Sequence, residues 1–109
     1  MRDKLALVEA SKDLRRVLLR YEKTSAEIAA RVERGESGTD ALKTAQGPLR
    51  RREVTDAVEK FEAARHRVRL AMFVLAGEEG VSASELARQL GISRQLASRL
   101  ANEAKESLS

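Results

Sequence analysis

Residues 82–100, S-A-S-E-L-A-R-Q-L-G-I-S-R-Q-L-A-S-R-L, decide the fold of the C-terminal part of the chain. Their apolar side chains recur at the spacing of one helix face, first over residues 86–90 and again over residues 96–100. Gly91 lies between the two segments, and glycine adopts a positive φ without a Cβ clash. The stretch therefore predicts two helices joined by a tight turn.

A serine stands where each of these helices is expected to begin. Ser82 is followed three positions later by Glu85, which is the spacing of a capping box. Ser93 is a natural N-cap for the second helix. Ile92 fills the corner between them. These residues place both helix starts within the motif.

The second predicted helix has an apolar face and a polar face. Leu96, Ala97 and Leu100 form the apolar face. The polar face consists of Arg94, Gln95, Ser98, Arg99 and Asn102. Such side chains can hydrogen-bond to base edges and phosphates. An ordinary helical hairpin with a glycine corner is the alternative interpretation, because such corners are common between helices.

The stretch L-A-R-Q-L-G-I-S-R-Q-L-A-S-R-L resembles the helix-turn-helix of prokaryotic transcription regulators, whose pattern runs L-A-x-x-L-G-[VI]-S-x-x-x-V-S-R-x-L. It departs from the pattern at Ala97, where a β-branched residue is commoner, and at Leu100, which follows Arg99 directly. The matching positions are Leu86, Ala87, Leu90, Gly91, Ile92, Ser93, Ser98 and Arg99.

The resemblance implies that the helix starting at Ser93 enters the major groove of double-stranded DNA. Arg94 and Gln95 are then the candidates for guanine and adenine edges. Ser82 and Ser84 lie at the exposed start of the first motif helix and are expected to touch phosphate. The predicted DNA-binding residues are Ser82, Ser84, Ser93, Arg94, Gln95, Ser98, Arg99 and Asn102.

Two long helices are predicted before the motif. Residues 4–34 contain no glycine or proline and carry an apolar stripe with steps of three and four, which predicts a helix about 45 Å long. Pro48 suits the first turn of a second helix, whose heptad stripe runs from Val54 to Leu75. Residues 35–47 are expected to be a connecting loop, with Thr39 or Asp40 able to cap a short helical turn. The second helix is expected to stop at Gly77.

These elements predict an all-α fold: an antiparallel hairpin or coiled coil, followed by a tri-helical helix-turn-helix without a wing. We expect the two stripes to bury each other and a second copy to complete a thin core, giving a homodimer. Leu70, Phe73 and Val74 lie off the heptad stripe and are expected to close the core of the motif. The expected division is residues 1–64 for dimerisation and residues 65–109 for DNA binding. A β wing after Ser109 is not expected.

Composition agrees with long charged helices and with a nucleic-acid partner. Of the 109 residues, 35% are charged and 3% are aromatic, and the formal net charge is +4. Four basic residues stand against one acidic residue over positions 88–105, so the excess lies at the motif. Cysteine is absent, which excludes disulfides and thiolate metal sites. With no long apolar run and no leader sequence, a cytoplasmic protein is expected.

Catalytic constellations are not apparent in the sequence. His66 is the single histidine and stands among arginines, so we interpret it as part of a solvated helix face. The segment G-E-S-G-T-D lacks the lysine of a phosphate-binding loop. Arg50, Arg51 and Arg52 open a helix, where an anionic partner would offset the unfavourable helix dipole. No enzyme activity, cofactor or metal is predicted.

The sequence thus predicts a dimeric, sequence-specific DNA-binding protein, a transcriptional regulator of prokaryotic type. The alternative is a coiled-coil adaptor that docks its C-terminal helical unit on a protein, since fold does not determine function. The outer face of the second motif helix discriminates between them, because a protein-docking face needs apolar anchors. The operator, the direction of regulation and any small-molecule effector are not indicated.

Overall fold

Five helices make up nearly all of residues 2–107, the part of the chain that the computed structural model describes. No β-strand occurs among these residues, so the predicted all-α fold is confirmed and the described part has no wing. The helices are α1 (Arg2–Glu33), α2 (Gly38–Thr44), α3 (Gly47–Glu78), α4 (Ala83–Leu90) and α5 (Arg94–Ser107).

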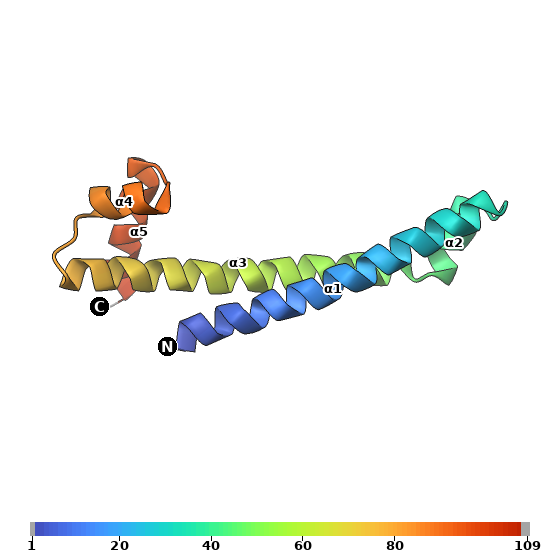
Figure 1. Cartoon of the computed structure of the whole chain (residues 1–109), viewed down its shortest axis with the longest axis horizontal. Coiled ribbons are helices and arrows are strands. Elements are labelled where there is room, and N and C mark those ends of the chain that lie inside the picture. Colours follow the sequence, from blue (N-terminus) through green and yellow to red (C-terminus); the bar gives the residue numbers. More distant parts are fainter. Residues whose placement is uncertain (1, 108–109) are drawn as a thin grey trace.

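The helices α1 and α3 form a long antiparallel hairpin (Figure 1). At its closed end lies α2, and at the other end α3 continues past the start of α1 and contacts α4 and α5. The molecule is therefore elongated, with principal extents of 64 × 26 × 20 Å. Within the described residues, α4 and α5 contact α3 and each other but not α1.

The connection between the long helices is more ordered than the sequence predicted. The predicted loop contains α2, and its N-cap is Ser37 rather than Thr39 or Asp40. The Ser37 hydroxyl accepts a hydrogen bond from the Asp40 backbone N–H at 3.1 Å. Gly47 then starts α3 beneath the side chain of Leu42, where a Cβ would collide with that side chain. A glycine at this position lets the connector fold tightly back on the hairpin.

The seam between α1 and α3 differs from the predicted packing of one apolar stripe on the other. Small or short side chains lie between the helices, and the most buried of them are Val17 and Thr24 on α1 and Ala57 and Ala64 on α3. Leucines and valines of the predicted stripes lie beside the seam, and Leu18 and Val58 remain 44% and 41% exposed. Small residues allow the backbones to approach, so the large side chains are displaced to one side.

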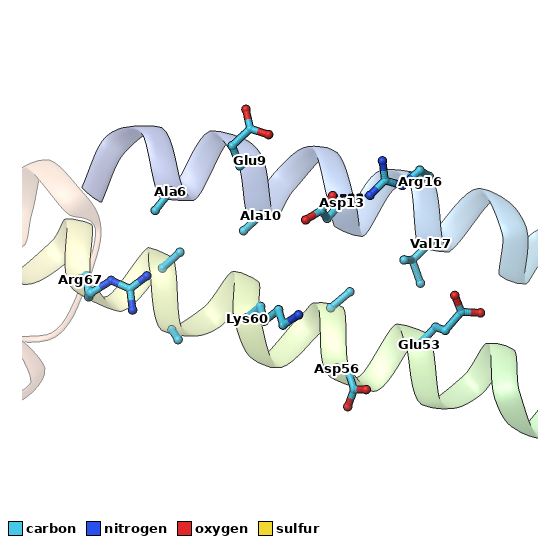
Figure 2. A pocket seen from close by; sticks show the side chains of 13 residues that line it. Ala6, Glu9, Ala10, Asp13, Arg16, Val17, Glu53, Asp56, Lys60 and Arg67 are labelled. Carbon is cyan, nitrogen blue, oxygen red and sulfur yellow. Dashed lines mark hydrogen bonds and ion pairs between the residues drawn. The ribbon is translucent and has the colours of Figure 1, made fainter. Parts of the chain in front are cut away.

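Charged residues line the opposite side of the seam. Figure 2 shows Ala6, Ala10 and Val17 pointing from α1 toward α3, with acidic and basic side chains around them. This open groove of about 610 Å³ includes carboxylates and cations from both helices. The hairpin therefore has a charged side and an apolar side.

Ion pairs set the register of the hairpin. Arg20 on α1 lies 2.9 Å from Glu53 on α3, and Glu53 also accepts a hydrogen bond from Arg50 at 2.6 Å. Asp3 and Arg67 are 3.8 Å apart at the open end. The hydrogen bond from Arg50, together with the charge of Arg20, lowers the pKa of Glu53. Residues 20 and 53 thus lie at one level of the hairpin.

The end of α3 also differs slightly from the prediction. The helix passes through Gly77 and ends at Glu78, and the positive φ of +76° occurs at Gly80. The Val81 N–H donates to the Ala76 carbonyl at 2.8 Å and closes the helix end. Ala76, in the last turn of the helix, is part of the core of the C-terminal unit.

Replacing Ala64 by leucine tests the small-residue seam. Ala64 is 1% exposed between the long helices, so the added atoms must push α1 and α3 apart. We expect Ala64→Leu to lower the free energy of unfolding by about 1–3 kcal/mol, measured by urea denaturation. The matched control is Ala63→Leu on the exposed neighbour, which should change stability little. Equal effects of the two variants would contradict the proposed seam.

Replacing Glu53 by glutamine tests the ion pairs. The pKa of Glu53 in the folded chain is lower than its ordinary value of 4.5. The Glu53 charge therefore stabilises the fold above pH 4.5, and this stabilisation is lost as the pH falls through the pKa of the folded state. We expect Glu53→Gln to be less stable than the parent at pH 7 and the difference to shrink below pH 4.5. Thermal melts over a pH series measure this. A difference that does not depend on pH would refute the role of the charge.

Candidate nucleic-acid interface

The C-terminal unit is built around one apolar cluster from three helices. Leu70 and Val74 of α3 pack against the cluster, as the sequence predicted. The last turns of α3 therefore serve as the first helix of the tri-helical unit. The buried members of the cluster are Phe73, Ala76, Leu86, Ala87, Ala97, Leu100 and Ala104.

The turn and both caps have the predicted geometry. Gly91 has a φ of +69°, and the Ile92 N–H donates to the Ala87 carbonyl at 3.0 Å. The Ser82 hydroxyl accepts from the Glu85 backbone N–H at 3.1 Å. The Glu85 carboxylate pairs with Arg88 at 3.3 Å. The Glu85 side chain is therefore turned toward the helix surface, and the predicted capping box is formed by the Ser82 hydroxyl alone. The Ser93 hydroxyl accepts from the Leu96 N–H at 3.1 Å and starts α5 at Arg94.

All eight residues that the sequence predicted for DNA contact are exposed. On α5, one shallow hollow brings Gln95, Ser98, Arg99 and Asn102 together, and Ser93 and Leu96 complete its lining. Arg94, the first residue of α5, does not line this hollow. Ser82 and Ser84 belong to the exposed first turn of α4 and are separate from the hollow.

The charges on α5 are available to an anionic partner. Arg94 and Arg99 are exposed and form no ion pair within residues 2–107. Glu106 lies two turns beyond Arg99 on the same helix, so the basic character decreases toward the C-terminal end of α5. The N-terminal half of α5 is therefore the part best suited to a phosphate backbone and to base edges.

A contact that the sequence did not predict joins α5 to the hairpin. His66 on α3 lies 2.8 Å from the carboxylate of Glu103, measured from Nε2 to Oε1. Its 43% exposed side chain is thus a bridge as well as part of a solvated face. His66 precedes Leu70 by four positions and therefore lies on the same helix face. Because Leu70 packs on the cluster that includes α5, this spacing is the signal in the sequence that places His66 near α5. The position of Glu103, 37 residues away, follows only from the fold.

Other kinds of site are not found in the described part of the chain. Among residues 2–107 there is no group of three His, Cys, Asp or Glu side chains that could hold a metal ion. In the same residues no helix is long and apolar enough to cross a membrane.

One comparison with known proteins matches the helices that carry this interface. Residues 64–107 match the family model of the MarR family, a family of helix-turn-helix transcriptional regulators. The match covers the end of α3 with α4 and α5 and leaves α1 and α2 outside it. No curated protein and no solved structure matched the chain. The chain therefore carries a DNA-binding helix-turn-helix of the transcription-regulator superfamily, as the residue pattern predicted.

Two glycine substitutions test the turn of the motif. A Cβ at Gly91 would touch no other atom, so the cost of Gly91→Ala comes from its positive φ alone and should be about 1 kcal/mol. Gly77 is helical and also has free space around it, so Gly77→Ala should stabilise by up to about 1 kcal/mol. Chemical denaturation measures both variants. Opposite signs support the turn, whereas a neutral Gly91→Ala would contradict its left-handed conformation.

Proposed function

We propose that this chain is a dimeric, sequence-specific DNA-binding regulator that inserts α5 into the major groove of double-stranded DNA. The observation that carries the proposal is the outer face of α5, where polar side chains converge on one hollow beside a capped helix start. A major groove about 12 Å wide admits one α-helix of this kind. The family match over the same residues supports a regulatory role.

The side chains divide into two kinds of contact. Gln95 lines the hollow and is suited to adenine N6 and N7, while Arg94, outside the hollow at the start of α5, is suited to guanine or to phosphate. Ser98, Arg99 and Asn102 extend the contact along the helix. Ser82 and Ser84 lie at the N-terminus of α4, where exposed backbone N–H groups and hydroxyls favour phosphate.

The adaptor interpretation has less support. A protein-docking face needs large apolar anchors, and the exposed positions of the α5 hollow are all polar. Leu96 is the one apolar residue that lines it, and it is half-buried against the core cluster. The hairpin, residues 1–64, is proposed to hold two copies together, and residues 65–109 are proposed to contact DNA.

Selection of bound fragments from a random duplex pool, followed by a salt series on the winner, tests the proposal. A specific dimeric regulator should enrich a palindrome and bind it at least about a thousandfold more tightly than random DNA. Weak binding without an enriched motif, lost at moderate salt, would contradict sequence-specific recognition.

Replacing Gln95 by alanine separates base contacts from phosphate contacts. Gln95 is neutral, so its loss should cost about 1–3 kcal/mol at one base pair and leave the salt dependence unchanged. Binding isotherms on the selected operator and on single-base variants measure this. The matched control is Gln89→Ala, an exposed glutamine on α4 outside the hollow, which should bind normally. A uniform loss on all sequences would remove Gln95 from the base-reading set.

A further inference from the structure

One side of the hairpin presents large apolar side chains to solvent. A hollow of about 300 Å³ is lined by Leu14, Leu18 and Leu19 of α1 and by Phe61 of α3, so the two helices share this side. Val54 and Val58 precede Phe61 by seven and three positions and lie on the same helix face. We define the apolar face as Leu7, Leu14, Leu18, Val54, Val58 and Phe61.

The two sides of the hairpin differ in how many charged side chains a partner would remove from water. The groove on the charged side contains Glu9, Asp13, Asp56 and Lys60 (Figure 2), and covering it would remove those charges from water. The hollow on the apolar face is lined by two charged side chains, Arg15 and Glu22, so covering it removes fewer charges from water. A partner is therefore expected on the apolar face only.

We infer that a second copy of this chain covers the apolar face, with the two-fold axis running along the hairpin. The result is a four-helix bundle in which each α1 packs on the α3 of the other copy. This inference rests on the proposed dimeric function and names the surface and the symmetry that it requires. A two-fold axis across the hairpin is the competing arrangement.

The area of the apolar side is sufficient for a stable dimer. Two helices side by side, each about 10 Å wide and about 45 Å long, present roughly 900 Å². Stable interfaces bury about 800 Å² on each partner. Four-helix bundles pack around a core of apolar positions spaced in this way.

Charge complementarity selects the axis. The ion pair between Arg20 and Glu53 puts these residues at one level, so Glu22 and Arg51 also share a level. A two-fold axis along the hairpin preserves levels and exchanges the helices. Glu22, which lines the hollow beside Leu18, then faces Arg51 of the second copy, and the pair forms twice. Neither residue has an ion pair within residues 2–107.

The position of the helix-turn-helix agrees with the same axis. Figure 1 shows α4 on the edge of α3 that faces away from the start of α1, and α5 running across α3 near the same end. The two-fold axis along the hairpin therefore puts both helix-turn-helix units at one end of the bundle. Two recognition helices at one end of the bundle can reach successive major grooves on one side of DNA, which are about 34–36 Å apart. The competing axis would instead put them at opposite ends of the 64 Å rod.

Sedimentation of the full chain without DNA tests the surface. Leu18→Lys adds a charge at the centre of the apolar face and should raise the dimer dissociation constant at least about a hundredfold. The matched control, Leu5→Lys, changes a 60% exposed leucine of the same helix that lies outside the face and should leave the dimer intact. A monomeric parent chain, or equal effects of the two variants, would overturn the inference.

A charge exchange tests the axis and does not depend on the fold tolerating Leu18→Lys. Glu22→Arg and Arg51→Glu alone should each weaken the dimer about tenfold, because like charges then meet twice. The double variant should restore parental affinity. A double variant no tighter than the single variants would overturn the axis along the hairpin, as would a selected operator with half-sites two turns apart.

Failure of this inference can be separated from failure of the proposed function. If the chain dimerises through Leu18 and responds to the charge exchange but selects no DNA sequence, DNA recognition is refuted and the dimer is supported. If the chain selects a single non-palindromic site and sediments as a monomer, only the dimer is refuted.

Discussion

The structure depends on the burial of α3 along two of its sides. Its N-terminal and central turns pack against α1 through alanines, and its last turns pack against α4 and α5 through Leu70, Phe73 and Ala76. Because α3 is one continuous helix, the hairpin and the DNA-binding unit are held by a single rod. Any change in the orientation of that rod is transmitted directly to α5.

This arrangement explains why α5 can be positioned without a wing in the described residues. The apolar cluster sets its distance from α3, and the contact between His66 and Glu103 adds a polar link on the same helix face. The caps at Ser82 and Ser93 set where each helix of the motif begins. The polar hollow of α5 then faces away from the core, where a DNA groove has access to it.

Most of the fold was predictable because it is local. Long uninterrupted segments with helical periodicity, one proline and a few glycines determine where helices begin and end to within a few residues. The exceptions have local causes as well. Ser37, rather than Thr39 or Asp40, caps the short helix of the connector, and Gly77 stays helical because the positive φ is taken at Gly80. The motif residues were found because helix-turn-helix geometry requires a glycine, two caps and an apolar face at known spacings.

The packing of the long helices could not be predicted in the same way. The heptad stripe marks which large residues share a face, but alanines at neighbouring positions form an equally regular stripe. Only the tertiary structure shows that the alanine stripe forms the seam, because close backbone approach depends on both helices at once. The same applies to Arg20 with Glu53 and to His66 with Glu103, which meet across large sequence separations.

The sequence by itself determined the helices, the turn at Gly91 and the chemistry of the exposed face of α5, because each depends on neighbours within about one helical turn. The tertiary structure decided which of two regular faces of α1 and α3 is buried between them. It also decided that Gln95 lines the hollow and that Arg94 lies outside it. These features depend on how close two helices can approach and on how far one is rotated about its axis, and a one-dimensional pattern does not contain either quantity.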